Sequence, residues 1–495
     1  MSLEEHHTEN MGKRLWRTPD RHQFALSAVL IIGAVLRLWH LDRTSLWYDE
    51  AVSWSQSNGS LAHLVTSVAS DNYPPLHNLL LWLTMPVLGD TEFALRLPSA
   101  VAGIVSIWLI YELGKLVFDQ NTGLLAALLL ALSPFHIWFS TEARMYALFA
   151  FTGLAFLIAL FKTLQGGRLI WPLLTAFFGA AFLYSHIYAT FAIACVGSVL
   201  LLQLALGHAE PDKINRKAQL RALAALLAAT CLFLPWLVIL ATRAKDVVSN
   251  GFWIATPDWQ FLTVMVRDMA GSEYLFLALV ALCLVAILPK TQKSAQSGAR
   301  RNEVWLLAAY CFGSFVIAYA LSILLRPILF DRYLIASWPV LLLLSAAGAS
   351  RLGTRIGPIA LMALTFWLTA QPLSFTLAEK IRPQWRDITY IYIEGRQDEA
   401  PLLLHKGFAL PALTYYLREQ QAVQTLDNTN NLTSLLSLKG PETWLLFAHS
   451  SQAEMDAILG QSPPFYIETG RWRSFGWGES GLTLIRLSNE ANSVK

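Results

Sequence analysis

Two adjacent carboxylates follow the first apolar run of the chain, in the sequence Trp47-Tyr48-Asp49-Glu50-Ala51. Neighbouring side chains on a helix point about 100° apart, so we expect Asp49 and Glu50 to have different tasks. One could face a substrate as a general base while the other binds a helix end or a cation. The pattern alone also fits a solvated acidic pair at a helix N-terminus.

A third carboxylate stands at a predicted bend, in the sequence Asp71-Asn72-Tyr73-Pro74-Pro75-Leu76-His77. Paired prolines give the chain a rigid entry into a helix, so Asp71 would be held at a fixed position. Asp71 is therefore a substitute for Asp49 or a metal ligand, and a plain helix cap is the alternative. His77 and His136 could assist a metal, although their spacing from the acids carries no signal.

Arginines recur near the predicted ends of apolar runs, at Arg96, Arg144, Arg326 and Arg332. An interfacial arginine can simply reach for water with its charged end. Several together indicate an anionic ligand, because the planar guanidinium fork matches phosphate oxygens. His186 stands in a predicted hairpin between two runs, where a lone histidine is either a satisfied interfacial residue or a ligand.

The composition shows what must position these residues. Of the 495 residues, 55% are hydrophobic and only 14% are charged, against about 25% charged in an ordinary soluble domain. A soluble fold of this length could not hide so much apolar surface, so the solvent must be a lipid bilayer. The net charge of +3 gives no reason to expect nucleic acid. The cysteines all lie in apolar runs, which predicts buried thiols and no disulfide framework.

About eleven apolar runs are long enough to cross a bilayer. The run Pro75–Leu88 is shorter, which favours an interfacial or re-entrant helix over a span. The predicted spans are Phe24–His40, Phe93–Phe118, Leu124–Phe139, Met145–Leu164, Leu169–Ser185, Ile187–Gly207, Leu220–Ala241, Tyr274–Pro289, Val304–Leu325, Tyr333–Ala349 and Ile359–Pro372.

The distribution of lysine and arginine orients these spans. With the N-terminus in the cytoplasm, the basic loops Gly207–Arg221 and Pro289–Glu303 and the turn with Arg351 fall inside, as the positive-inside rule requires. We read the first run as an uncleaved span because no small-residue cleavage pattern follows it. Loops 41–92 and 243–272 and the tail then lie outside, so the ionisable residues above are expected to converge in one pocket at that membrane face.

The predicted fold is a polytopic α-helical membrane protein of about 11–13 transmembrane helices with a small C-terminal extracytoplasmic α/β domain. Its predicted parts are a cytoplasmic tail at 1–23, a transmembrane domain at 24–373 and the soluble domain at 374–495. That domain shows no glycine-rich phosphate loop and no nucleophile elbow, so we expect it to be structural or acceptor-facing. Its expected strands are 401–405, 443–448, 464–468 and 481–487, and its expected helices are 410–417 and 452–459.

Taken together, these motifs resemble the GT-C membrane glycosyltransferases. The similarity is to the dolichyl-phosphate-mannose–protein mannosyltransferase superfamily and its bacterial members, which include the lipid A aminoarabinose transferases. It runs from about Leu36 to Arg386, and the order of the motifs is more specific than any one of them. The motifs are Asp49-Glu50, Tyr73-Pro74-Pro75-Leu76, Arg96-Leu97-Pro98, Glu142-Ala143-Arg144-Met145-Tyr146, His186-Ile187-Tyr188, Asp331-Arg332-Tyr333-Leu334 and Trp385-Arg386-Asp387.

The resemblance implies transfer of a sugar from a polyprenyl-phosphate, expected to be undecaprenyl-phosphate, on the outer side of the inner membrane. The acceptor would be a lipid, protein or glycan. Asp49 matches the catalytic acid of the family, Glu50 its neighbour, and Asp71 completes the expected catalytic set. Tyr73 stands where the family often has histidine and where many aminoarabinose transferases have lysine, which leaves the donor and acceptor open. The expected donor phosphate-binding residues are Arg96, Arg144, Tyr146, His186, Arg332 and Tyr333.

The chemistry of such a transfer suits these residue types. The departing lipid phosphate gains negative charge in the transition state, which fixed cationic donors stabilise. An attacking hydroxyl must lose a proton, which a carboxylate within reach can accept. No cofactor is required by this scheme, and a divalent metal ion is left open.

Three other functions are compatible with parts of the pattern. A transporter or flippase would need ionisable residues near the middle of the bilayer and matched broken helices, and the sequence has no detectable internal repeats. A non-enzymatic envelope assembly protein would not need Asp49. A ligase that moves a preassembled glycan would use the same acids and arginines.

Overall fold

The computed structural model describes most of the chain, and the described residues form two compact units. Unit 1 comprises residues 1–37, 101–137 and 146–370, and unit 2 comprises 38–100, 138–145 and 371–495. Most of the predicted cytoplasmic tail and of two basic loops lies outside the described residues. The described ranges are 21–39, 41–71, 73–206, 215–249, 254–288, 301–353, 355–378, 382–397, 400–418, 423–426, 432, 442–474, 476 and 481–489.

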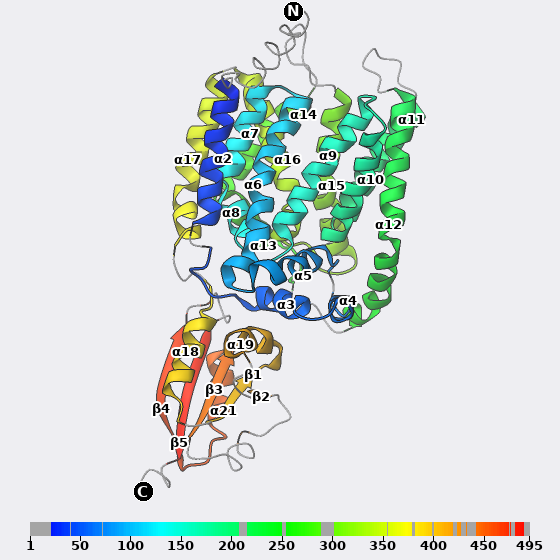
Figure 1. Ribbon diagram of the computed structural model, residues 1–495. Coiled ribbons are helices and arrows are strands. Elements are labelled where there is room, and N and C mark those ends of the chain that lie inside the picture. The colour runs from blue at the N-terminus through cyan, green and yellow to red at the C-terminus, as the bar shows by residue number, and fades with distance from the viewer. Residues whose placement is uncertain are drawn as a thin grey trace, which may run out of the picture. The chain divides into compact units, whose positions relative to one another are not determined.

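Unit 1 is a bundle of apolar helices (Figure 1). Each predicted apolar run forms one helix or one bent pair of helices. The elements are α2 (Arg21–Leu38), α6 (Glu92–Val117, whose first turns belong to unit 2), α7 (Gln120–Leu132), α8 (Pro134–Ser140, which ends in unit 2), α9 (Tyr146–Leu164), α10 (Ile170–Ser185), α11 (Ala189–Leu206), α12 (Arg216–Ser249), α13 (Trp259–Ala270), α14 (Glu273–Ile287), α15 (Arg301–Leu324), η1 (Asp331–Leu334), α16 (Ser337–Leu352) and α17 (Ile356–Thr376).

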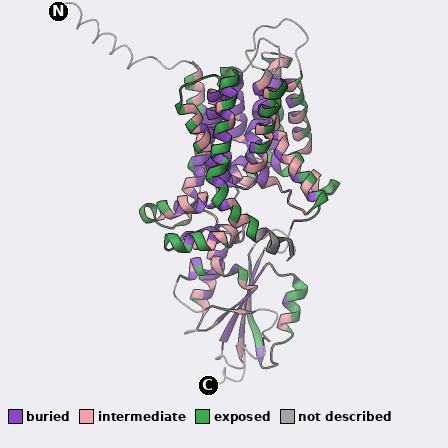
Figure 2. Cartoon of the chain, turned by 90° about the vertical axis from the view of Figure 1, so that its right-hand side faces the viewer, coloured by how far each residue is buried: buried purple, intermediate pink, exposed green. Residues whose placement is uncertain are grey.

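Seven helices in the described part of the chain are long and apolar enough to cross a membrane, or nine if each bent pair counts as one span. α10 and α16, with 16 residues each, bring the number to the eleven runs expected from the sequence. Burial separates inner from outer helices (Figure 2). The apolar window of α9 is 83% buried, whereas those of α2 and α17 are 17% buried and leave their apolar side chains for lipid. The chain is thus a multi-pass membrane protein.

Two pairs of helices bend sharply where the sequence stops a helix. Between α7 and α8 the axis turns by 64° at Ser133, ahead of Pro134. Between α13 and α14 it turns by 80° at Gly271, whose φ of 80° ends α13 in the left-handed conformation that glycine adopts without steric cost. The region expected as outer loop 243–272 therefore contains helix α13, whose N-cap is Asp258.

Unit 2 contains three helices from the predicted outer loop 41–92. They are α3 (Tyr48–Ser57), α4 (Leu61–Ala69) and α5 (Leu76–Leu88). Ser60 caps α4 by accepting a hydrogen bond from the backbone N–H of His63 at 3.1 Å. α5 has 13 residues, about 20 Å of helix, which is too short to cross about 30 Å of hydrocarbon.

The C-terminal part of unit 2 is a five-stranded mixed sheet in the order β2-β1-β3-β5-β4. β1 is parallel to β2 and β3, and β5 is antiparallel to β3 and β4. The sequence did not predict β2 or α18, and β4 extends further than expected. The elements are α18 (Trp385–Gly395), β1 (Leu402–His405), η2 (Gly407–Ala409), α19 (Leu410–Leu417), β2 (Val423–Leu426), β3 (Glu442–Ala448), α21 (Gln452–Leu459), β4 (Tyr466–Ser474) and β5 (Leu482–Asn489).

Helix α3 packs on this C-terminal domain. Ala51 is fully buried in one hydrophobic cluster with Trp385, Leu413 and Trp444. The Trp54 and Tyr415 rings meet edge to face with centroids 5.1 Å apart, and α19 lies against α3. The helix that carries Asp49 and Glu50 is therefore fixed by apolar burial, which is the dominant stabilising force in such contacts.

Candidate active site

The carboxylate of Glu50 lies at the centre of a buried polar network in unit 2. Its Oε1 accepts from Arg96 Nε at 2.7 Å and from the Ala143 backbone N–H at 2.8 Å. Its Oε2 accepts from Arg96 Nη2 at 2.7 Å and from the Trp47 backbone N–H at 3.2 Å, which closes the first turn of α3. Because Glu50 is completely buried and bound on both oxygens, we assign it a positioning role and revise the expectation that it acts in catalysis.

Arg96 uses all of its donors within the protein. Besides two bonds to Glu50, its Nη1 donates to the Leu41 and Thr44 carbonyls and its Nη2 to the Ser45 carbonyl, each at 2.8 Å. A guanidinium has five N–H groups, so this set leaves none for a phosphate. We therefore infer that Arg96 holds the segment that leads into α3, in place of the expected role in binding the donor phosphate.

A second arginine completes the network from the segment before α18. Arg382 Nη1 lies 3.6 Å from Glu50 Oε2, and its Nη2 lies 3.3 Å from Glu142 Oε1. The guanidinium also stacks 4.9 Å from the centroid of Trp138. Arg382 was not predicted as a site residue, and its only signal in the sequence is a basic residue just before the Trp385-Arg386 motif.

The electrostatics of Glu50 follow from these partners. Burial by itself raises the pKa of Glu50, but the charge and hydrogen bonds of Arg96, with Arg382 and the Ala143 N–H, outweigh burial and hold the pKa below its usual value. Glu50 is thus ionised at neutral pH. Burying an ionised carboxylate costs free energy, and the hydrogen bonds and ion pairs on both oxygens of Glu50 offset that cost.

Asp49 is half-buried on the same turn of α3, where its backbone carbonyl accepts from Arg144 Nη1 at 3.2 Å. The same Nη1 donates to Ser53 Oγ, one turn further along α3, at 3.0 Å. The Arg144 guanidinium also lies 5.2 Å from the centroid of the Tyr73 ring. The structure therefore brings together the Asp49, Arg144 and Tyr73 motifs, which are far apart in the sequence.

Asp71 is tied to α3 and α5 by amide side chains. Gln56 Nε2 donates to Asp71 Oδ2 at 2.9 Å, and Asn78 Nδ2 donates to Gln56 Oε1 at 2.9 Å. Burial raises the pKa of the Tyr48 phenol, the charges of Asp49 and Asp71 raise it further, and Arg144 opposes them. Both acids and one arginine thus act on the same phenol, which places Asp71 in the electrostatic neighbourhood of Asp49.

His77 lies in the first turn of α5 and is only 2% exposed. Burial lowers the pKa of His77 to about 3, with a further contribution from the positive charge of Arg144. His77 is therefore neutral at physiological pH. It cannot serve as a cationic phosphate ligand there.

The remaining expected site residues belong to unit 1 and lie around Arg332 of η1. The guanidinium lies 5.7 Å from the centroid of Tyr146 and 5.8 Å from that of Tyr333, with Phe330 at 4.9 Å. The His186 ring lies 4.9 Å from that of Tyr333. Four of the six residues expected to bind the donor phosphate thus form one aromatic and cationic cluster, which we call the Arg332 cluster (Tyr146, His186, Phe330, Arg332 and Tyr333).

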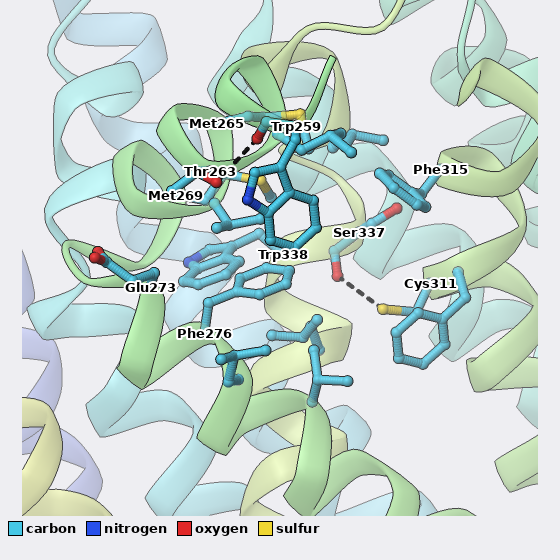
Figure 3. A pocket seen from close by; sticks show the side chains of 17 residues that line it. Trp259, Thr263, Met265, Met269, Glu273, Phe276, Cys311, Phe315, Ser337 and Trp338 are labelled. Carbon is cyan, nitrogen blue, oxygen red and sulfur yellow. Dashed lines mark hydrogen bonds between the residues drawn. The ribbon is translucent and has the colours of Figure 1, made fainter. Parts of the chain in front are cut away.

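An apolar cavity of about 520 Å³ also lies in unit 1, lined by α13, α14, α15 and α16. Figure 3 shows Trp259, Met265 and Met269 from α13, together with Phe276 and Trp338, around it. Leu334, the last residue of η1, also lines the cavity. The short helix η1 therefore carries both Arg332 and a wall residue of the cavity.

In the part of the chain that the structure describes, no three His, Cys, Asp or Glu side chains come together as a metal-binding group.

Comparison with solved structures places this arrangement in a known fold. ArnT from Cupriavidus metallidurans, in the apo state, superimposes with a TM-score of 0.60 over 94% of this chain and 97% of ArnT, at 12% identity. The chain has the GT-C fold. ArnT bound to undecaprenyl phosphate gives a TM-score of 0.58, and an Archaeoglobus fulgidus oligosaccharyltransferase gives 0.53 over 93% of this chain and 74% of that one, at 12% identity.

Sequence comparison covers less of the chain. The family model of dolichyl-phosphate-mannose-protein mannosyltransferases matches residues 72–239. YycA of Bacillus subtilis (strain 168), whose name marks it as a candidate mannosyltransferase, is 27% identical over 164 residues, or 32% of this chain and 24% of YycA. The match thus spans about a quarter of that relative. The resemblance to GT-C glycosyltransferases expected from the sequence is confirmed.

Proposed function

We propose that the protein is a glycosyltransferase that moves a sugar from a polyprenyl-phosphate donor to an acceptor hydroxyl, with Asp49 as general base. The observation that carries this proposal is the construction of α3. Glu50 forms buried ion pairs with Arg96 and Arg382. Asp49, its neighbour on the helix, is half-buried, and its backbone carbonyl accepts from Arg144. Two adjacent acids thus have two tasks, one positioning and one chemical.

The proposed reaction assigns a group to each change of charge. The acceptor oxygen forms a bond to the sugar carbon, and its proton passes to the Asp49 carboxylate. The bond from that carbon to the phosphate oxygen breaks, and the polyprenyl phosphate leaves with one more negative charge. Positioned cations stabilise that charge where it develops. We assign this role to Arg144, which donates to the backbone carbonyl of Asp49.

The Arg332 cluster and the apolar cavity suit the two parts of a lipid-phosphate donor. The Arg332 guanidinium lies 4.9 to 5.8 Å from the centroids of three aromatic rings, and its planar fork suits the oxygen atoms of a phosphate. η1 joins Arg332 to the cavity wall through Leu334, and the cavity has the apolar lining that a polyprenyl chain would require. The ArnT structure with undecaprenyl phosphate supports this donor class, and undecaprenyl phosphate is the carrier we propose.

The acceptor and orientation complete the proposal. We propose a hexosyl or pentosyl transfer to a lipid, protein or glycan on the outer side of the inner membrane, with the N-terminus cytoplasmic and the C-terminal domain periplasmic. Asp71, held by Gln56, is proposed to assist Asp49 in the same electrostatic field. A transporter, a scaffold or a glycan ligase are the alternatives that an assay must separate.

The test is transfer by the purified full-length protein in liposomes. The donors are radiolabelled polyprenyl-phosphate sugars extracted from the parent strain, and the acceptors are washed membranes of a deletion strain. Asp49→Asn should lower the rate about 10²- to 10⁴-fold, because the amide cannot accept the proton, while the protein accumulates normally. Asp42→Asn, the same change at an exposed residue of the preceding segment, should leave the rate unchanged. Full transfer by Asp49→Asn would reject the proposed function.

A further inference from the structure

The carboxyl edge of the C-terminal sheet lies where α/β sheets commonly bind ligands. β1 ends at His405 and β3 at Ala448, and the two strands are parallel neighbours, so the residues that follow them share one edge. β2 follows β1 in the chain but lies on its other side, so the strand order reverses between β1 and β3. Ligands of open α/β sheets bind beyond the carboxyl ends of strands at such a reversal.

The first residue after each of these strands has an unusual backbone conformation. Lys406 has φ 66° and His449 has φ 52°, in a region that side chains other than glycine seldom occupy. Lys406 Nζ donates to the His449 carbonyl at 2.5 Å, which joins the two turns. Glycine would adopt these backbone conformations with less steric strain than lysine or histidine. Strain of this kind is concentrated at functional sites.

Three rings meet at this edge, and one of them comes from the helix that carries Asp49. The Tyr48 ring lies 5.3 Å from that of Phe408 and 6.5 Å from that of His449, and the Phe408 and His449 rings are 5.5 Å apart. Phe408 is 48% exposed, which is a high value for phenylalanine in a soluble domain. Tyr48 immediately precedes Asp49, so the ring cluster continues directly into the candidate base.

Positively charged, negatively charged and neutral polar side chains lie beside the rings. Lys406 Nζ lies 3.1 Å from Glu454 Oε2 and both side chains are partly exposed. Ser450 Oγ pairs with His405 Nδ1 at 2.8 Å. Rings beside an ammonium, a carboxylate and a hydroxyl offer apolar contact for C–H groups and partners for O–H groups, which is the surface chemistry of a sugar ring. The paired charges leave little net attraction for an anion.

We propose that this edge, made of Tyr48, Lys406, Phe408, His449, Ser450 and Glu454, binds a sugar unit of a glycan acceptor. The inference rests on the proposed transferase function and names the acceptor class. The surface is continuous with α3 through Tyr48, so a glycan held there is presented next to Asp49. The C-terminal domain is then the acceptor-binding part of the enzyme.

The experiment measures transfer as a function of the amount of acceptor membranes, with the full-length protein and the extracted donors described above. Phe408→Ala should raise the amount needed for half-maximal rate about threefold to tenfold, the effect of one lost ring contact, with the donor dependence kept. His449→Gly removes a second ring at a backbone conformation that glycine accepts, and it keeps the carbonyl bound by Lys406. It should produce a shift of similar size.

The matched control is Phe465→Ala. Phe465 is 46% exposed and directly precedes β4, which begins opposite the end of β5 and hence at the other edge of the sheet. This variant should behave like the wild type. If Phe408→Ala and His449→Gly match Phe465→Ala while Asp49→Asn is inactive, the acceptor surface is rejected and the transferase function stands.

Treatment of the acceptor membranes identifies the class of acceptor. Periodate cleaves the vicinal diols of sugars, and it should abolish saturable acceptance, whereas protease treatment should leave it intact. The opposite result would show a protein acceptor and overturn the proposal. If Asp49→Asn transfers as well as the wild type, the transferase function itself fails.

Discussion

Two arginines, one in each unit, have guanidinium groups with different kinds of partner. Arg96 in unit 2 donates five hydrogen bonds to a carboxylate and three carbonyl oxygens and is 1% exposed. Arg332 in unit 1 lies among the rings of Tyr146, Phe330 and Tyr333. The first donates its N–H groups to oxygen atoms of the protein, and the second lies beside three aromatic rings.

The difference separates structure from chemistry. A buried ion pair contributes little net stability, because desolvation offsets the attraction, yet removing one partner is costly. Arg96 is therefore expected to matter for folding and to have no direct part in the reaction. The planar fork of an arginine suits phosphate recognition, and Arg332 is the arginine that we propose to bind the donor phosphate. It is therefore expected to matter for the reaction and little for folding.

The sharpest test of this contrast is the same substitution at both positions, and the largest effect is expected at Arg96. Arg96→Met removes the bidentate partner of the buried Glu50 carboxylate and leaves it two backbone N–H groups and Arg382 at 3.6 Å. The free energy of unfolding should therefore fall by about 3 to 5 kcal/mol. The measurements are the amount of full-length protein in the membrane and its thermal unfolding in detergent. Adding Glu50→Gln should restore part of the loss, because the double variant no longer buries an unpaired charge.

Arg332→Met should show the reverse pattern, with a smaller effect that appears in activity. Loss of one positioned donor to a developing charge lowers the catalytic rate by about 10²- to 10³-fold, while methionine still packs among the rings. Thermal unfolding should stay close to that of the wild type, and transfer from the extracted donors should fall. Equal destabilisation by Arg96→Met and Arg332→Met would break the comparison.

The sequence predicted the helical architecture well for a physical reason. In lipid the backbone must satisfy its own hydrogen bonds, so an apolar run of sufficient length becomes a helix. α17 nevertheless continues past Pro372, where the predicted run ended, because a proline near a helix end is tolerated when its neighbours satisfy the freed carbonyl. β2 was missed because its four residues, Val423–Leu426, carry polar Gln424 and Thr425 and show no apolar run.

The residue types of the candidate site could be predicted from the sequence, but the role of each residue could not. Adjacent acids at Asp49 and Glu50 indicated two tasks, and the structure gives the positioning task to Glu50. The sequence could not show that Arg96 meets Glu50, because the two residues are brought together by tertiary packing between α3 and the first turns of α6. Arg382 was missed for the same reason, since its partners Glu50 and Glu142 are more than 200 positions away in the chain.

The smallest expected effect concerns His77 of unit 2, whose pKa is lowered by burial and by the charge of Arg144. It tests whether this part of unit 2 is closed to water. The pKa of His77 is lowered to about 3 in the folded state and is about 6.5 when unfolded. Between these values the unfolded state binds one more proton, so the stability of the protein rises with pH and falls as pH drops below 6.5.

Replacing His77 should therefore flatten the dependence of stability on pH. From pH 6.5 to pH 5 the wild type loses about 2 kcal/mol through this residue, and His77→Phe should not. His63→Phe, at an exposed histidine of α4, should keep the slope of the wild type. Thermal unfolding measured at intervals from pH 5 to pH 8 distinguishes them, and parallel curves for all three proteins would mean that His77 is open to water.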